Sequence, residues 1–219
     1  MNKVYGYNNT PTFFFFDCET TGFNPKGETG DRICQLAWQV YNNEFHLITE
    51  KSYIIKPVGF TIPEEVSKIH GITNEKAGLE GVEFLTVFAE FEKDLKNCEN
   101  VVAHNLEFDE SFVNHHHYFD TLEKLGKLPE QASDILIGKE KFCTMKNQDI
   151  IAFCKLPNPN YRRGRSYYKW PNLRELHSKL FGCSFDNAHD ALVDTKATAK
   201  CFFELTRLNI ILLRLINAQ

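Results

Sequence analysis

Apolar residues recur along the chain at two spacings, and the change between them separates strand-like from helix-like segments. Dense or alternating apolar runs over 12–17, 33–41 and 45–56 predict three successive strands. The segments between them are short, so these strands are expected to form an antiparallel meander. A short apolar run, "NVVAHN" at 100–105, predicts a further, buried strand.

Helical spacing of apolar residues dominates the rest of the chain. It predicts helices over about 63–71, 82–97, 109–125, 143–154 and 172–181, and a long one starting near 188 or 190. Gly71 and Gly182 are typical stop residues for two of them. The order of elements indicates an α/β fold with a mixed sheet flanked by helices, in which the fourth strand lies parallel to the first.

Length and composition favour one compact domain over residues 1–219. The chain is 42% hydrophobic, enough for a sizeable core. No run approaches the roughly 20 apolar residues that a membrane span needs. The N-terminal segment has only a four-residue apolar block, too short for the core of a signal peptide. We therefore expect a soluble cytoplasmic protein without a membrane partner.

Cysteine usage and net charge narrow the possible classes of function. The seven cysteines are scattered without a C-x-x-C pair, which favours reduced, mostly buried thiols over disulfides or a zinc ribbon. The formal net charge of −4 argues against a protein that coats nucleic acid by bulk electrostatics. It leaves a nucleic-acid enzyme open, because bound cations can reverse the local sign of charge.

Two carboxylates follow the first strand in "FFFFDCETTG", residues 13–22. Asp17 and Glu19 are two residues apart, so at a strand end they point to the same face, about 6.6 Å apart. Two ionised carboxylates at that distance repel each other, and a cation such as Mg²⁺ or Mn²⁺ would offset the repulsion. The alternative is a solvated strand end, and the buried-looking phenylalanines before it argue only partly against that.

Two later segments carry similar chemistry. In "AHNLEFD", Asp109 follows the fourth strand near a helix start, where an ordinary helix-start aspartate is the alternative. In "HDALVDTKATA", His189 precedes a helix that contains Asp194. Asp190 and Asp194 form a like-charge i, i+4 pair that is unfavourable without a nearby cation. The alternative there is a capping Asp190 and a solvated Asp194.

The combination of "DCETTG", "HGIT", "HNLEFD" and "HDALVDT", in this order, resembles the DEDDh 3′–5′ exonucleases of the RNase H-like superfamily, most closely the epsilon-type proofreading group. The resemblance spans roughly residues 12–206. It implies that Asp17, Glu19, Asp109 and Asp194 hold two divalent cations, Mg²⁺ or Mn²⁺, and that His189 is the general base. It also implies release of nucleoside 5′-monophosphates from a 3′ end.

The same resemblance suggests which residues contact the substrate. Thr20, through its backbone, and Phe23 would meet the terminal nucleotide, Ile72 would pack on its base, and Asn105 would hydrogen-bond to the strand. For these residues a place in the core, or a turn-capping role for Asn105, is an equal alternative. His70 and His104 are expected to be structural.

A basic and aromatic loop is expected over about 155–171. It carries Arg162, Arg163 and Arg165 among tyrosines and a tryptophan, the composition that single-strand binding uses. A solvated surface loop is the alternative. The "HHH" run at 115–117 is not expected to bind metal, because consecutive helical residues point about 100° apart.

Three functions remain open from the sequence. The first is an exonuclease that acts on DNA 3′ ends, single-stranded or frayed. The second is an RNA-trimming relative with the same chemistry, and the third is a non-catalytic nucleic-acid-binding protein of the same fold. An apolar C-terminal helix end, at about 205–217, is expected to dock on the core, or else on a polymerase or repair partner or a second copy of the chain.

Overall fold

The computed structural model describes residues 11–26, 30–125, 134–162 and 167–212. Its strands are β1 (Pro11–Thr20), β2 (Ile33–Asn42), β3 (Leu47–Ile54), β4 (Asn100–Ala103) and β5 (Glu140–Cys143). Its helices are α1 (Glu64–His70), α2 (Asn74–Glu80), α3 (Phe84–Lys96), α4 (Leu106–Leu125), α5 (Gln148–Cys154), α6 (Leu173–Phe181) and α7 (Ala191–Arg207).

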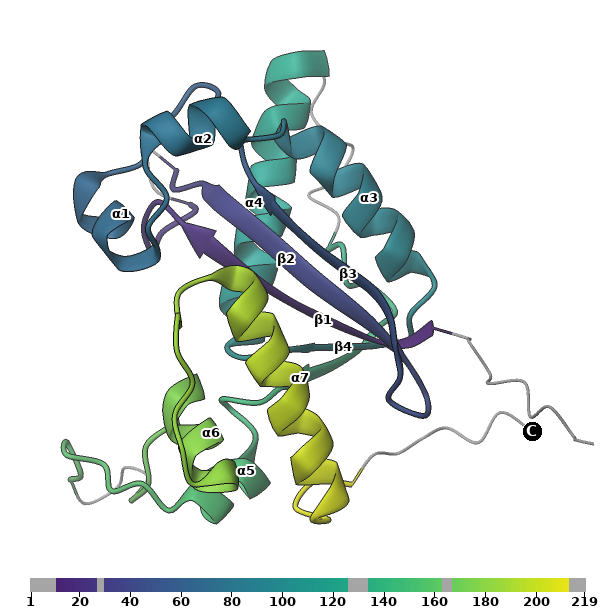
Figure 1. Ribbon diagram of the computed structural model, residues 1–219, viewed down its shortest axis with the longest axis vertical. Coiled ribbons are helices and arrows are strands. Elements are labelled where there is room, and N and C mark those ends of the chain that lie inside the picture. The colour runs from purple at the N-terminus through teal and green to yellow at the C-terminus, as the bar shows by residue number, and fades with distance from the viewer. Residues whose placement is uncertain (1–10, 27–29, 126–133, 163–166, 213–219) are drawn as a thin grey trace, which may run out of the picture.

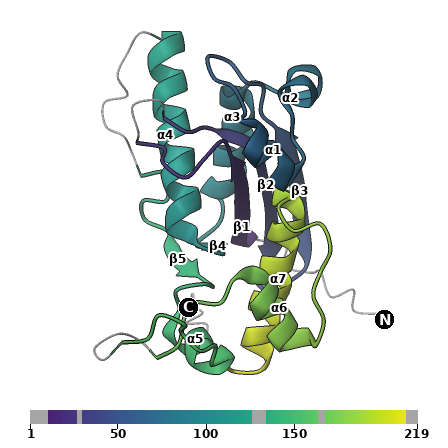
Figure 2. The ribbon, with the colours of Figure 1, turned by 90° about the vertical axis from the view of Figure 1, so that its left-hand side faces the viewer.

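The strands form one mixed sheet in the order β3-β2-β1-β4-β5. β1 pairs antiparallel with β2 and parallel with β4, and β5 continues the parallel half. Helix α7 crosses one face of the sheet while α3 and α4 cover the other (Figures 1 and 2). The expected α/β architecture, with a meander followed by a strand parallel to β1, is confirmed.

The central strand β1 is buried on both faces, and its alternating side chains build two cores. Phe14 and Phe16 pack into the core beneath α3 and α4, whereas Phe13 and Phe15 pack into the core beneath α7. All four rings are at most 1% exposed. The run of phenylalanines therefore follows from a strand that is covered by helices on both sides.

Several elements differ from the expectations. A fifth strand, β5, immediately precedes the segment expected to be helical over 143–154 and shares only Cys143 with it, and α5 begins only at Gln148. Its sequence, "EKFC", is too short and too polar to indicate a strand without its partner β4. A second helix, α2, follows Gly71, where Thr73 accepts a hydrogen bond from the backbone N–H of Lys76 as N-cap.

The C-terminal helix is shorter than expected. α7 ends at Arg207, so the described part of the segment 205–217 is helical only in its first residues. Leu205 and Ile211 nevertheless lie in the core beneath α7, which is the docking expected on the core. Residues 213–217 lie outside the described residues.

All seven cysteines are free thiols and five of them are buried, as expected. Among the described residues, no helix has the length and apolar character that crossing a bilayer requires.

We predict that Phe91→Ala strongly destabilises the fold. Its buried ring contacts Phe14, Phe16 and Trp38 at centroid distances of 4.9, 5.5 and 5.4 Å, so truncation leaves a cavity at the centre of one core. The expected loss in the free energy of unfolding is about 3–5 kcal/mol, measured by urea denaturation. Leu79→Ala, at a side chain that is 81% exposed, is the control and should stay within about 0.5 kcal/mol of wild type. Equal losses in both variants would contradict this assignment of the core.

Candidate active site

A cavity of about 410 Å³ lies where the end of β1 meets α1 and the first turns of α4, α6 and α7. Its walls include all five residues expected to be catalytic, namely Asp17, Glu19, Asp109, His189 and Asp194. The fold thus brings together three segments that lie far apart in the sequence.

Asp17 and Glu19 lie within β1, which continues to Thr20 rather than ending at Asp17. They continue the alternation of Phe13 and Phe15, so they belong to the face of the sheet that α7 covers. Pairing of β1 with β2 on one side and β4 on the other holds this strand in place.

Asp109 reaches the cavity from the first turn of α4, which begins three residues earlier than expected. Its Oδ1 accepts hydrogen bonds from the backbone N–H of Cys18 at 3.1 Å and from the Cys18 thiol at 3.3 Å. Cys18 is buried, as expected for a core residue, but its thiol also anchors a candidate ligand. These two donors fix the Asp109 carboxylate against β1, at the residue that separates Asp17 from Glu19.

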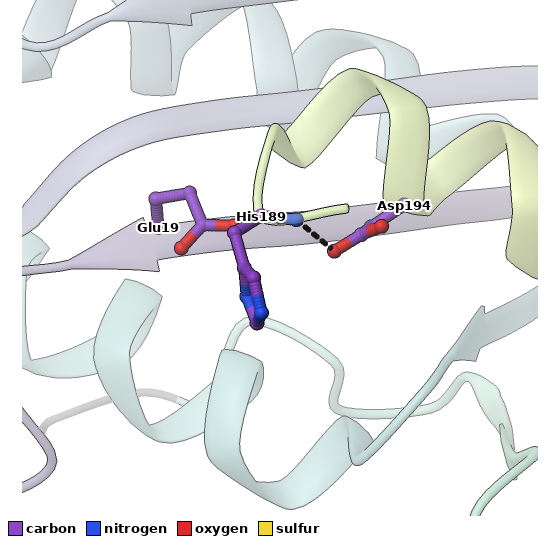
Figure 3. Close-up of side chains that lie close together, drawn as sticks. All are labelled: Glu19, His189 and Asp194. Atoms are coloured by element: carbon purple, nitrogen blue, oxygen red, sulfur yellow. Dashed lines mark hydrogen bonds between the residues drawn. The ribbon is translucent and has the colours of Figure 1, made fainter. Parts of the chain in front are cut away.

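His189 and Asp194 flank the start of α7 (Figure 3). The backbone N–H of His189 donates to Asp194 Oδ2 at 3.0 Å, and His189 adopts a left-handed φ of 74° that turns the chain into the helix. Asp190 is the N-cap of α7 and accepts hydrogen bonds from the backbone N–H groups of Leu192 and Val193. The capping role that the sequence left open for Asp190 is therefore the one it has. Asp194, in contrast, is half-buried, and its Oδ1 is shielded from solvent rather than solvated.

Gln35 of β2 ties the start of α7 to the sheet. Its side-chain amide donates to Asp190 Oδ2 at 3.2 Å, and its carbonyl oxygen accepts from the backbone N–H of Ala191 at 3.1 Å. A single buried side chain therefore sets the position of the helix that carries Asp194.

Burial, and to a lesser extent nearby carboxylates, raise the pKa values of all four acids. Burial raises the pKa of Glu19 to about 8, helped by the charges of Asp194 and Asp109. Burial also raises the pKa of Asp109 to about 7, opposed by the hydrogen bonds from Cys18. The pKa values of Asp17 and Asp194 are raised by burial first, and that of Asp17 further by the neighbouring aspartates. The site accumulates negative charge that the protein itself does not neutralise.

The donor set fits a hard divalent cation. A carboxylate oxygen of Glu19, a ring nitrogen of His189 and a carboxylate oxygen of Asp194 lie within 4.8 Å of one another. Asp17 and Asp109 line the same cavity outside that group. Asp194 Oδ1 is buried and, among the described residues, has no hydrogen-bond partner. An oxygen that is desolvated without a donor is what a metal ligand looks like in the absence of its metal.

Comparison with known proteins assigns the family. A model of the exonuclease family, of the RNase T type, matches residues 14–202. The chain belongs to the exonuclease family. DNA polymerase III subunit epsilon of Aquifex aeolicus (strain VF5) is 32% identical over 198 residues, which cover 89% of this chain and 80% of that protein. The similarity to the epsilon-type group that the motifs indicate is confirmed, and exonucleases of this family generally use divalent metal ions.

Solved structures of exonuclease I share the fold. E. coli exonuclease I in complex with a dT13 oligonucleotide matches 89% of this chain with a TM-score of 0.65 and 22% identity. Exonuclease I from Methylocaldum szegediense also matches 89% of this chain, with a TM-score of 0.65 and 20% identity. The RNase H-like architecture is thereby confirmed. The chain spans 40% of the length of either exonuclease I chain.

Three of the expected substrate contacts of this exonuclease domain line the cavity: Thr20, Phe23 and Asn105. Phe23 is 83% exposed, an unusual position for a phenylalanine without a ligand. It follows Gly22, where an added Cβ would meet the carboxylate of Asp31 and require that side chain to move. Asn105 takes a left-handed φ of 79° at the start of α4, which asparagine tolerates better than most residues.

The expectation for Ile72 was wrong. Ile72 is 3% exposed and packs against Cys34, Ile62 and Ala77 in a small separate core, so it does not reach the cavity. The helix before it, α1, presents Val66 and Ile69 to the cavity instead. The "HGIT" motif indicated the correct segment, but the residues of this segment that reach the cavity are Ile69 and Val66 of the helix α1, three and six positions before Ile72.

The expected loop at 155–171 folds back on itself as an arm. Lys169 donates its backbone N–H to the Leu156 carbonyl, and Asn158 donates to the Tyr167 carbonyl, both at 3.0 Å. Arg162 is exposed on this arm and does not line the cavity. Arg163 and Arg165 lie outside the described residues.

Five further histidines make contacts within the fold, and two of these five also line the cavity. In the "HHH" segment, His116 stacks on Phe84 and His117 on Phe88, while His115 contacts the Ser111 carbonyl, so the three point different ways, as expected. His70 and His104 make side-chain contacts within the fold but also line the cavity, which the sequence did not indicate. The sequence also did not indicate that Asn172 and Leu173, at the start of α6, line the cavity, because only the packing of α6 against the rest of the fold brings them to it.

We predict that Glu19→Gln stabilises the metal-free protein at a pH above 8. The folded-state pKa of about 8 lies above the ordinary 4.5, so the stability contributed by the neutral form is fully present below 4.5. It is lost as the pH rises through 8, and the glutamine variant should not show this loss.

The expected difference in the free energy of unfolding is on the order of a few kcal/mol, measured by urea denaturation in EDTA across this pH range. Glu65→Gln, at an exposed glutamate of α1, is the matched control. The same pH dependence in wild type and Glu19→Gln would contradict the prediction.

Proposed function

We propose that this protein is a DEDDh-type 3′–5′ exonuclease that hydrolyses phosphodiester bonds at the 3′ end of DNA, single-stranded or frayed, and releases nucleoside 5′-monophosphates. The observation that carries the proposal is the convergence of one buried carboxylate, three partly buried carboxylates and one exposed imidazole on a single cavity. Membership of the exonuclease family supports it.

In this proposal Asp17, Glu19, Asp109 and Asp194 would hold two divalent cations, Mg²⁺ or Mn²⁺. Four carboxylates carry a charge of −4, which two such cations balance before a substrate phosphate arrives. When bound, the cations would supply electrostatic stabilisation of the attacking and leaving oxygens. The raised pKa values and the unpartnered oxygen of Asp194 support this assignment.

His189 is proposed as the general base for the attacking water. Its ring is exposed at the mouth of the cavity, where it can pass a proton to solvent, while its backbone is held by Asp194. An imidazole titrates near neutral pH, so it can accept a proton under ordinary conditions.

The terminal nucleotide would lie between apolar and polar walls of the cavity. Phe23 on one side, with Val66 and Ile69 of α1, offers apolar surface suited to a base. Asn105 offers an amide for hydrogen bonding, and the backbone at Thr20 lies beside the carboxylates. Arg162, with Arg163 and Arg165, is proposed to contact the backbone of the strand further from its end.

The same site would accept RNA if it tolerates the 2′-hydroxyl, and comparison of matched DNA and RNA strands decides between the two substrates. A polymerase partner is also proposed, on the ground that the epsilon relative is a subunit of DNA polymerase III.

We predict that wild-type protein shortens a 5′-labelled single-stranded DNA from its 3′ end with Mg²⁺ or Mn²⁺ and not in EDTA. Asp17→Ala should abolish this ladder because it removes a metal ligand. His189→Ala should lower kcat about 10²–10⁴-fold, the usual contribution of a general base. Glu110→Ala, at a glutamate beside Asp109 that pairs with Lys141 instead, is the matched control and should retain activity.

If wild-type protein leaves the strands intact under every metal condition but still binds them measurably, the proposal is contradicted. That outcome would favour the non-catalytic binding protein.

We predict that replacing Arg162, Arg163 and Arg165 together by alanine raises KM on long single strands with little change in kcat. The variant should also show a weaker salt dependence of binding, with a log–log slope smaller by about 0.7 for each phosphate that is no longer neutralised. Fluorescence anisotropy at several salt concentrations measures this slope. Replacing the exposed Lys76, Lys93 and Lys96 of α2 and α3 removes the same charge elsewhere and should leave the slope unchanged. Equal slopes in wild type and the arginine variant would show that the arm does not bind phosphates.

A further inference from the structure

Trp170 is an exposed aromatic residue that lies close in the chain to residues of the cavity wall. Its residue surface is 54% exposed, whereas the other tryptophan of the chain, Trp38, is fully buried. Two and three residues later, Asn172 and Leu173 line the cavity. A tryptophan side chain normally buries most of its large apolar surface, so one exposed beside an active site suggests a missing partner.

The side chain of Lys146 contacts this ring. The Lys146 ammonium lies 5.2 Å from the centre of the Trp170 ring and also forms an ion pair with Glu107. Glu107 belongs to the first turn of α4, between the cavity residues Asn105 and Asp109. Lys146 thus links the Trp170 ring to the first turn of α4, which also carries Asp109, and this contact restricts the ring before a ligand binds.

The arm that precedes Trp170 continues the aromatic surface away from the cavity. Tyr161 and Tyr167 are 50% and 59% exposed, and their rings meet edge to face at 5.3 Å. Tyr167 in turn meets Tyr168 at 5.0 Å. Lysine and arginine side chains accompany these rings, and the one nearby acid of α6, Glu175, is neutralised by Lys169. Aromatic rings interspersed with basic residues, on a segment that has no acid of its own, suit a single nucleic-acid strand.

We propose that Trp170 is a stacking platform for a base of the substrate strand upstream of the two 3′-terminal nucleotides, and that it selects strands whose bases are unpaired at that position. This inference rests on the proposed function, because it uses the cavity as the place where the 3′ end is held. A base can stack on the ring only if it is free of a paired partner strand. Stacking uses the π-face that every base has, so the platform tolerates any sequence.

The kinetic test compares a dinucleotide, which cannot extend past the cavity rim, with a longer oligothymidylate. Trp170→Leu is expected to raise KM on the long strand about 10-fold, the typical effect of losing one base–aromatic stack, and to change KM on the dinucleotide by less than about twofold. Trp170→Phe keeps an aromatic face and should remain within about threefold of wild type on both substrates. Ile137→Ala, a distant exposed apolar residue, is the control. An equal rise in KM on both substrates, or none on the long strand, would overturn the proposal.

A binding test is independent of catalysis. Trp170 is the exposed member of the only two tryptophans, so stacking should quench its fluorescence when an oligothymidylate with hydrolysis-resistant phosphorothioate linkages is added with Mg²⁺. Trp170→Phe leaves buried Trp38 alone and should show no quenching. Quenching that is the same in both proteins would overturn the proposal. If wild type hydrolyses neither substrate, the proposed function fails, whereas the quenching result still decides whether Trp170 meets a base.

Discussion

The structure depends above all on holding four carboxylates together in one partly buried cavity, where solvent screens their charges less than at the surface. Asp17, Glu19, Asp109 and Asp194 line one cavity, and burial raises the pKa of each. In a chain of ordinary stability, such mutual repulsion would push the side chains apart or into solvent. The surrounding fold has to oppose this tendency.

Each carboxylate is restrained by a different element. The two on β1 are carried by a strand covered on both faces, with phenylalanines packed above and below it. Asp109 is held by two donors from Cys18, and Asp194 by the backbone N–H of His189. These bonds satisfy only part of the carboxylate oxygens, which leaves the remainder available for cations. A stable scaffold therefore supports a locally unfavourable site, as is common where function requires it.

The charge of the molecule is divided in space. A protein with a net charge of −4 would repel a polyanion at long range, and the carboxylate site adds to that repulsion. The arm and its surroundings carry positive charge and exposed rings, with Glu175 and Glu107 already paired to Lys169 and Lys146. An arrangement of this kind can hold the body of a strand at a favourable surface while its end lies among the carboxylates.

How much the sequence could predict depends on how local each feature is. The α/β class, the meander, the Asp17–Glu19 pair and the stop at Gly71 follow from patterns within a few residues, where side-chain alternation and capping act directly. The order of the motifs also identified five of the residues that line the cavity. Strand β5 could not be foreseen, because "EKFC" becomes a strand only by pairing with β4, a segment distant in the sequence.

The features of the site also separate into those that the sequence determined and those that the tertiary structure decided. The sequence by itself determined the donor chemistry, since the residue types and their order come from the chain alone. Only the tertiary structure decided that Ile72 faces a separate core while Val66 and Ile69 face the cavity, and that the Cys18 thiol holds Asp109. It also placed Lys146 against Trp170. The physical reason is that burial and long-range contacts depend on how helices and strands pack, and no local pattern of residues encodes that packing.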